Sequence, residues 1–509
     1  MGGPARRPRG GGPIRRGWGK ISDTTTFFID IFLLLTAAVV AGEIATRLGQ
    51  TALVGQLLVG VVLGPTLIGP YIGLSSLTPE LSAIQFLATV FILFMAGLDI
   101  VPEQISRMGV RTALMGVAVF AVPFATITVL ARLLMPGSAA LLPWFLGVTL
   151  SITALPVMGI MLVEFGLLKT RIGNLLINTA LVNELTAVTV FAILLQLQTG
   201  STNGLLAVAV AVLSVAVFIG AMFSVHMLLR TLGGTSWWES TRIRIAQQIR
   251  TKESGFAILM ICVFGASLFS QYMGLTFVVG AFYAGILVTR ESAGPEAHRT
   301  ISSIFDAMTW GFFVPLFFAF VGVQMNFRLL LTPVDLAMFA AFAVVAIVSK
   351  YGTGFLVARF NGWPPRDARA IGHLVSSRGA VELAMAVILL GDGVFHASTF
   401  TLVAGVGLVC TLIAPMAAAR TWRLTTPGRS AVEQRMEALR AARVAGEVPV
   451  RALAFQLVDE TAFDPTLGAE VGPEPPASPP GGPGPGADSR GAGLPPGPPP
   501  LPKKRSGGR

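Results

Sequence analysis

Four ionisable residues lie near the middle of long apolar stretches, and these are the side chains that could do chemistry. They are Glu184, Lys350, Arg378 and Glu382. A charge at the depth of a bilayer is costly, so such residues usually face one another or a water-filled path. Asn183 directly precedes Glu184. A carboxylate held away from bulk water binds either a proton or a desolvated alkali cation, and this competition is enough to couple the movements of the two ions. A permanent ion pair of Glu184 with Lys350 or Arg378 is the alternative interpretation.

Polar residues interrupt one apolar stretch of the N-terminal half. They are Ser151, Thr153 and Pro156. A proline within a membrane helix frees a carbonyl group, and the Thr153 hydroxyl can satisfy the backbone or contact an ion. A simple proline kink would explain the same residues, so both interpretations stay open.

A second interruption lies in the C-terminal half, where Ser376, Ser377 and Gly379 surround Arg378. Two interrupted spans in separate halves of a chain are the best sequence indication of a transporter site at the membrane midplane, built from an inverted repeat. Each interruption leaves partly charged helix ends, which the buried lysine and arginine could offset. Arg378 and Glu382 also have the i, i+4 spacing at which opposite charges pair on one helix.

The composition predicts an all-α polytopic membrane protein that positions these residues. Of the 509 residues, 53% are hydrophobic and 12% are charged, whereas soluble domains have about 25% charged residues. Apolar runs of bilayer-spanning length recur, and each is expected to be a helix because lipid offers no partner to an unpaired backbone group. About 13 transmembrane helices are expected. Their centres lie near residues 35, 60, 90, 122, 153, 186, 217, 262, 282, 312, 344, 380 and 409.

Basic residues alternate between the connecting loops, and this alternation predicts the orientation of the chain. Every second connection carries Lys or Arg, for example Arg47, Arg107, Lys169 and Arg366, and the connections between them carry almost none. The basic loops and the C-terminus are expected in the cytoplasm, with the protein in the cell (inner) membrane and the N-terminus outside. The basic segment before the first span fits the opposite orientation or a signal peptide. The six basic loops agree with one another, however, and they outweigh this single segment. Because the net charge of +11 lies in loops and tails, nucleic-acid binding is not expected.

The chain is expected to divide into four parts. Residues 1–25 form a basic N-terminal tail, and residues 26–420 form the membrane domain. Residues 421–464 are a cytoplasmic segment with a short amphipathic helix, and residues 465–509 are a Pro/Gly-rich tail with too little apolar surface to fold. No nucleotide-binding domain and no cofactor are expected. An intramembrane enzyme is disfavoured because the sequence contains neither HExxH nor GxSxG.

Several short motifs occur in an order and spacing that are more specific than any one of them. They are Gly42–Gln56 followed by Gly64-Pro65, Leu93–Asp99, Gly280–Gly285, Phe317–Gly322 and Arg378–Glu382. With these motifs, residues 25–420 resemble the monovalent cation:proton antiporter-2 family, the sodium (potassium)/proton exchangers.

The resemblance implies a sodium/proton antiporter fold of about 13 helices, in which two broken helices cross. It also implies a homodimer formed through the first and middle helices. The family's ion-binding carboxylate, usually Asp, falls on Glu184, and its core lysine falls on Lys350. The residue before the carboxylate is Asp in electrogenic members and Asn, as at Asn183, in members regarded as electroneutral.

These features together predict a secondary antiporter, embedded in membrane lipid, that exchanges Na⁺ or K⁺ for H⁺ by alternating access. Glu184 would carry the proton one way and the cation the other, with Asn183, Thr153 and backbone carbonyls completing the transient oxygen shell. A single titrating carboxylate predicts electroneutral exchange. Two alternatives stay open: a potassium efflux channel or system, and an efflux antiporter for an organic cation or ionophore on the same fold.

Overall fold

The computed structural model describes residues 23–100 except 49 and 75, residues 108–165, 167, 170–199, 205–233, 254–288 and 303–423. The first described helix begins at Asp23 and the last ends at Arg423. Residues 23–25 of the expected N-terminal tail and residues 421–423 of the expected cytoplasmic segment are therefore helical. The rest of the basic N-terminal tail, the expected amphipathic helix and the Pro/Gly-rich tail lie outside the described residues.

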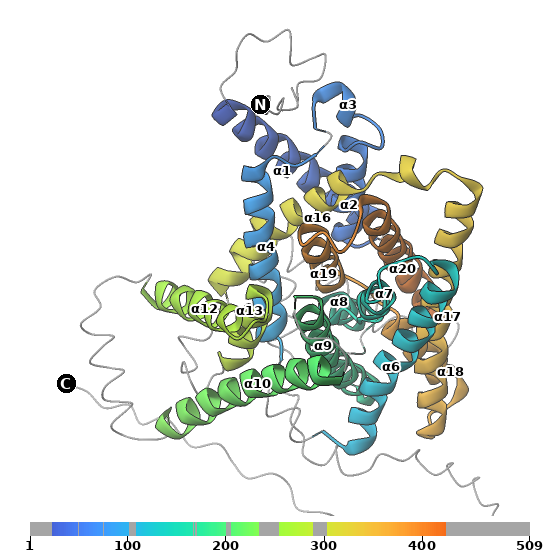
Figure 1. Cartoon of the computed structure of the whole chain (residues 1–509). Helices are drawn as coiled ribbons and strands as arrows, with labels where there is room; N and C mark the ends of the chain where they lie inside the picture. Colours follow the sequence, from blue (N-terminus) through green and yellow to red (C-terminus); the bar gives the residue numbers. More distant parts are fainter. Residues whose placement is uncertain are drawn as a thin grey trace, which may run out of the picture. The chain divides into compact units, whose positions relative to one another are not determined.

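Every regular element among the described residues is a helix, and the helices follow the order of the apolar runs (Figure 1). The N-terminal half contains α1 (Asp23–Arg47), α2 (Ala52–Leu63), α3 (Gly69–Ile72), α4 (Pro79–Leu98), α6 (Val110–Leu134), α7 (Leu142–Thr149), α8 (Leu155–Glu164) and α9 (Arg171–Thr199). The middle contains α10 (Leu205–Gly233), α12 (Ser254–Tyr272) and α13 (Phe277–Leu287). The C-terminal part contains the π-helix η2 (Thr309–Phe313), α16 (Val314–Gln324), the short 3₁₀-helix η3 (Phe327–Leu330), α17 (Pro333–Phe360), α18 (Pro365–Val375), α19 (Ala380–Gly391) and α20 (Ala397–Arg423).

The expected spans agree with these helices. Each expected centre falls on a helix, except that residue 153 lies between α7 and α8; residue 380 is the first residue of α19. Among the described residues, nine helical stretches are long and apolar enough to cross a membrane, and α2, α12 and α13 are shorter apolar helices. The prediction of an all-α polytopic membrane fold is confirmed.

Local sequence signals fix where two of the long helices begin. Thr78 caps α4 by accepting a hydrogen bond from the backbone N–H of Leu81 at 3.4 Å, and Thr332 caps α17 in the same way through Asp335 at 3.1 Å. A proline follows each threonine, at the first helical position, where its missing N–H is not needed.

Two helix pairs pack so closely that glycine is required at the contact. A Cβ atom added to Gly60 of α2 would lie 2.2 Å from the carbonyl oxygen of Ala319 in α16. A Cβ atom added to Gly97 of α4 would lie 1.8 Å from the carbonyl oxygen of Phe282 in α13. Small residues at such contacts let the backbones of membrane helices approach one another.

The helix pairings recur in the two halves, as an inverted repeat predicts. The contact of α1 with α2 matches that of α12 with α13, the contact of α2 with α16 matches that of α13 with α4, and α6 packs on α7 as α17 packs on α18. We call α1, α2, α4, α12, α13 and α16 the frame, and α6–α9 together with α17–α20 the core. Helices α19 and α20 contact the frame helices α2, α4 and α16.

Candidate functional site

The first helix break separates α7 from α8, and residues 150–154 are not helical. The Ser151 hydroxyl donates to the carbonyl of Gly147 at 2.6 Å, which satisfies one of the free carbonyls at the end of α7. Pro156 is the second residue of α8, in the first turn, where a proline fits without loss of a hydrogen bond. The proline therefore begins a new helix and does not kink a continuous one.

The second break separates α18 from α19, and residues 376–379 are not helical. The Ser376 hydroxyl donates to the carbonyl of Gly372 at 2.8 Å, so it serves the end of its own helix. Glu382 lies in the first turn of α19. A negative charge is favourable there because the start of a helix is partly positive.

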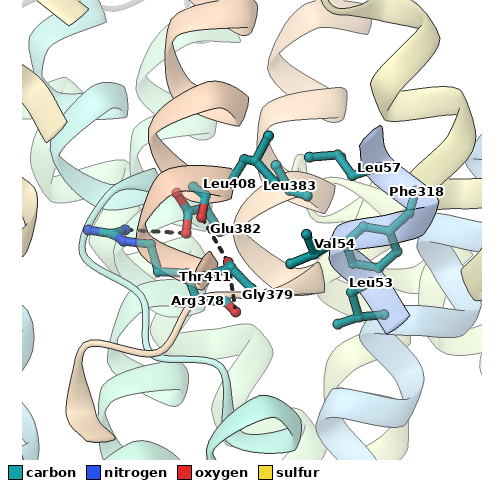
Figure 2. A pocket seen from close by; sticks show the side chains of 11 residues that line it. Leu53, Val54, Leu57, Phe318, Arg378, Gly379, Glu382, Leu383, Leu408 and Thr411 are labelled. Carbon is teal, nitrogen blue, oxygen red and sulfur yellow. Dashed lines mark hydrogen bonds and ion pairs between the residues drawn. The ribbon is translucent and has the colours of Figure 1, made fainter. Parts of the chain in front are cut away.

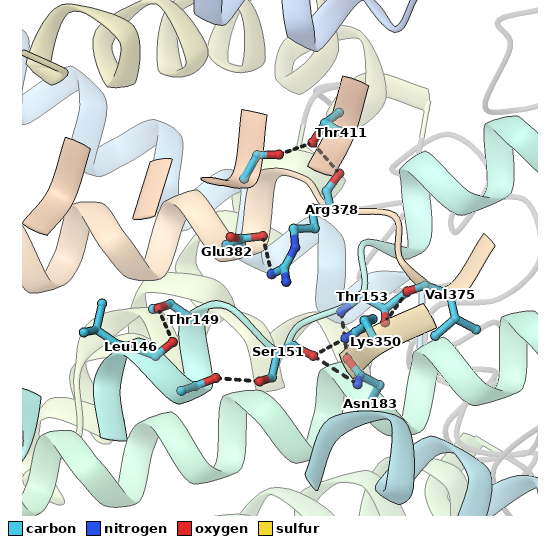
Figure 3. A network of polar contacts seen from close by, with 12 residues as sticks. Leu146, Thr149, Ser151, Thr153, Asn183, Lys350, Val375, Arg378, Glu382 and Thr411 are labelled. Atoms are coloured by element: carbon cyan, nitrogen blue, oxygen red, sulfur yellow. Dashed lines mark hydrogen bonds and ion pairs between the residues drawn. The ribbon is translucent and has the colours of Figure 1, made fainter. Parts of the chain in front are cut away.

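The two breaks are joined directly by hydrogen bonds (Figure 3). The backbone N–H of Ala154 donates to the carbonyl of Ser377 at 3.1 Å. The Thr153 hydroxyl donates to the carbonyl of Val375, the last residue of α18, at 3.0 Å. The partly positive start of α8 thus meets the partly negative end of α18, and each satisfies groups that the other leaves free.

Asn183 of α9 ties this helix to the first break. Its side-chain oxygen accepts the backbone N–H of Thr153 at 2.8 Å, and its side-chain amide donates to the carbonyl of Ser151 at 3.3 Å. Glu184 is the next residue of α9, and its side chain is completely buried, at 0% exposure. The carboxylate is therefore shielded from bulk water, next to the residue that contacts the break.

Lys350 of α17 is also completely buried, at 0% exposure. Its ammonium group donates to the carbonyl of Ser151, the same carbonyl that Asn183 contacts (Figure 3). Ser151 follows Leu150, the residue that caps the carboxyl end of α7. The lysine therefore places a positive charge at the partly negative end of that helix.

Arg378, within the second break, forms an ion pair with Glu382 of α19, with 3.2 Å between Nη1 and Oε2 and both side chains at 1% exposure. Both residues line a pocket between core and frame (Figure 2). Its other wall includes Leu53 and Val54 of α2 and Phe318 of α16. The i, i+4 spacing that suggested this pair in the sequence corresponds to a real contact.

Two residues of this region had no signal in the sequence. The Thr411 hydroxyl of α20 donates to the carbonyl of Gly407 at 2.8 Å and lies 3.4 Å from the carbonyl of Arg378. Ala154 contributes a backbone N–H to the contact between the breaks. A threonine in an apolar helix and an alanine beside a proline are both common, so neither could be singled out without the tertiary contacts.

Known proteins with similar sequences show the family of this chain. The model of the family described as "Sodium/hydrogen exchanger, transmembrane" matches residues 32–424. The Na⁺/H⁺-K⁺ antiporter GerN of Bacillus cereus is 27% identical over 395 residues, which cover 76% of this chain and 94% of GerN. The K⁺/H⁺ antiporter 1 of Saccharomyces cerevisiae is 26% identical over 415 residues, which cover 77% of this chain and 46% of the yeast protein.

A solved structure shares the fold. The sodium proton antiporter MjNhaP1 from Methanocaldococcus jannaschii superimposes with a TM-score of 0.58 at 14% identity, covering 78% of this chain and 100% of that structure. The family match extends over both breaks, over α9 with its buried carboxylate and over α17 with its buried lysine. The chain therefore belongs to the transmembrane sodium/hydrogen exchanger family.

Proposed function

We propose that this chain exchanges a monovalent cation, Na⁺ or K⁺, for H⁺, and that Glu184 is the residue at which the two ions compete. The observation that carries the proposal is the position of Glu184, completely buried and directly after the residue that holds the first break. A proton and a desolvated cation both neutralise such a carboxylate, so the departure of one favours the arrival of the other. The named activities of GerN and of the yeast relative agree with this exchange.

Oxygen atoms near Glu184 would complete the coordination of the cation. The Asn183 side-chain oxygen and the Thr153 hydroxyl are our candidates, and each takes part in one hydrogen bond at the first break. Each oxygen has two lone pairs. The Asn183 oxygen accepts one hydrogen bond and keeps one lone pair for a cation, whereas the Thr153 hydroxyl donates its bond and keeps both. Uncharged Asn183 adds no second titrating group at this position, which supports one-for-one, electroneutral exchange.

Alternating access would follow from movement of the core against the frame. The pocket beside Arg378 and Glu382 lies on the boundary between the two, where packing is interrupted. We further propose that the protein is a homodimer formed through α1 and the middle helices, in the cell (inner) membrane, with the N-terminus outside and the C-terminus cytoplasmic. The alternation of basic loops supports this orientation.

The test uses the purified full-length protein in liposomes that contain a pH-sensitive dye. Na⁺, K⁺ and Li⁺ are added in turn, with and without an imposed voltage. We expect a cation-dependent pH change that Glu184→Gln abolishes without changing expression or the apparent melting temperature. The matched control is Glu43→Gln, which neutralises an exposed glutamate in an ion pair with Arg47. Near-normal exchange by Glu184→Gln would remove this residue from the mechanism, and cation flux that ignores the proton gradient would favour a channel.

A further inference from the structure

The two breaks touch at a pair of small residues, Ala154 and Gly379. A Cβ atom added to Gly379 would lie 2.7 Å from the Cβ of Ala154 and 3.1 Å from the Cγ2 of Val157, whereas ordinary contacts lie at 3.4–4 Å. The φ angle of Gly379 is −173°, an extended backbone that any residue adopts. Space, and not backbone conformation, therefore restricts this position to glycine.

Two hydrogen bonds beside this contact hold the breaks together. Ala154 itself donates its N–H to Ser377, at 3.1 Å, and the Thr153 hydroxyl reaches Val375 at 3.0 Å. These bonds favour a close approach of the two segments, and the contact of Ala154 with Gly379 limits that approach. The distance between the breaks is thus set by one methyl group facing one glycine.

That distance matters because each break presents an oxygen atom near the other. The Ser377 hydroxyl is completely buried, at 0% exposure, and has no hydrogen-bond partner among the described residues. An unpartnered buried hydroxyl is costly, so this oxygen is available to a ligand. Thr153 of the first break donates its hydroxyl to Val375, two residues before Ser377, and its N–H binds Asn183, the neighbour of Glu184.

We infer that the contact between Ala154 and Gly379 sets the spacing of the oxygen atoms that the two breaks offer to the cation, and thereby determines the size of cation that the site accepts. This inference rests on the proposed function of Glu184. Selectivity among alkali cations depends on the size of the oxygen cage and on how rigidly it is held. Ala154 and Gly379 are positioning residues here, because they contact the segments that carry the oxygen atoms and not the ion.

The structure gives the direction of the change. Gly379→Ala adds a methyl group 2.7 Å from the Cβ of Ala154, so the breaks have to separate, and a wider cage favours K⁺ over the smaller Na⁺. Ala154→Gly removes the atom that the new methyl group meets. The double variant Gly379→Ala/Ala154→Gly should therefore restore the original spacing, because the remaining contact with the Cγ2 of Val157, at 3.1 Å, requires a shift of only a few tenths of an ångström.

The experiment measures KM for Na⁺ and for K⁺ with the full-length protein in dye-loaded liposomes. In Gly379→Ala we expect the ratio of KM for Na⁺ to KM for K⁺ to rise about tenfold, equivalent to about 1.4 kcal/mol, and in the double variant to return to within about twofold of the starting value. The matched control is Gly159→Ala in α8, whose added Cβ meets no atom of the described residues within 4 Å. An unchanged ratio in folded Gly379→Ala, or a failure of the double variant to restore it, overturns the inference.

A second variant keeps the inference testable if Gly379→Ala does not fold. Ala154→Gly alone loosens the contact and should change the KM ratio about threefold or more, whereas an unchanged ratio again overturns the inference. If the proposed function itself is wrong, the result is different from an unchanged KM ratio: the unaltered protein then shows no cation-dependent proton movement.

Discussion

The ammonium group of Lys350 donates to the backbone carbonyl of Ser151, so a side chain of α17 is fixed to the break between α7 and α8. The side-chain amide of Asn183 donates to the same carbonyl at 3.3 Å. A charge from the C-terminal half therefore stabilises the helix break of the N-terminal half, and a neutral amide from α9 shares the task. Because both groups contact this carbonyl, the effects of a substitution of Lys350 and a substitution of Asn183 are not expected to add.

Substitutions of Lys350 separate a structural charge from a titrating one. Lys350→Met removes a charged donor from a buried carbonyl, which should lower stability by about 1.5–3 kcal/mol and the apparent melting temperature with it. Lys350→Arg keeps a charge that does not deprotonate and should retain exchange that ignores voltage. Arg359→Met, at the exposed end of the same helix, is the control and should change stability less. A folded Lys350→Arg protein without exchange would mean that the lysine proton takes part in the cycle.

Asn183→Asp tests whether the residue before Glu184 sets the charge balance. The substitution adds a second carboxylate beside the break and removes the donor that reaches Ser151. If the added carboxylate titrates, each cycle moves net charge, and exchange should respond to an imposed membrane potential. Proton movement is measured at different voltages set with a potassium ionophore. Asn178→Asp adds the same charge on the same helix, where the native side-chain amide donates to the side-chain oxygen of Asn174 at 2.9 Å, and its exchange should stay voltage-independent. A voltage-independent Asn183→Asp would show that stoichiometry is set elsewhere.

A double-mutant cycle tests the buried pair of Arg378 and Glu382. Because both side chains are 1% exposed, removing one partner leaves the other charge uncompensated and should cost about 3–5 kcal/mol. The double variant Arg378→Met/Glu382→Leu should be more stable than either single variant, since no lone charge remains. Apparent melting temperatures of the four purified proteins give the coupling. Costs that simply add would mean that the two residues do not pair.

Much of this architecture was predictable because the bilayer restricts what the backbone can do. Apolar runs had to be helices. The interruptions of these runs near Thr153 and Gly379 had to be buried inside the protein, away from lipid. Glu184 and Lys350 lie near the middle of their apolar runs, and this position predicted that both residues are buried at the depth of the bilayer centre. Arg378 and Glu382 are only four residues apart, so the spacing of this pair was visible in the sequence, although Arg378 lies in the break and only Glu382 lies in α19.

The contacts between the breaks could not be predicted, since they depend on how separate helices meet. The sequence indicated that Lys350 could offset the charge of a helix end, but depth along a helix does not give direction, so the bond to Ser151 could not be predicted. The two hydrogen bonds of Asn183 require α9 to pass beside residues 151–153. Ala154 and Gly379 face each other although they lie more than 200 positions apart in the sequence. Small apolar residues are too common in membrane helices to indicate such a contact.

The close packing of α4 on α13 gives a stability prediction that is independent of ion binding. A methyl group at Gly97 would meet the carbonyl oxygen of Phe282 at 1.8 Å, and the helices have to separate to admit it. Gly97→Ala should therefore lower stability by about 1–3 kcal/mol. Gly265→Ala in α12 places its methyl group where no atom of the part of the chain that the structure describes lies within 4 Å. This variant should be neutral or more stable by about 0.5–1 kcal/mol, because alanine favours the helix. Equal apparent melting temperatures of the two variants would contradict the contact, because only one of the two methyl groups has a backbone oxygen in its way.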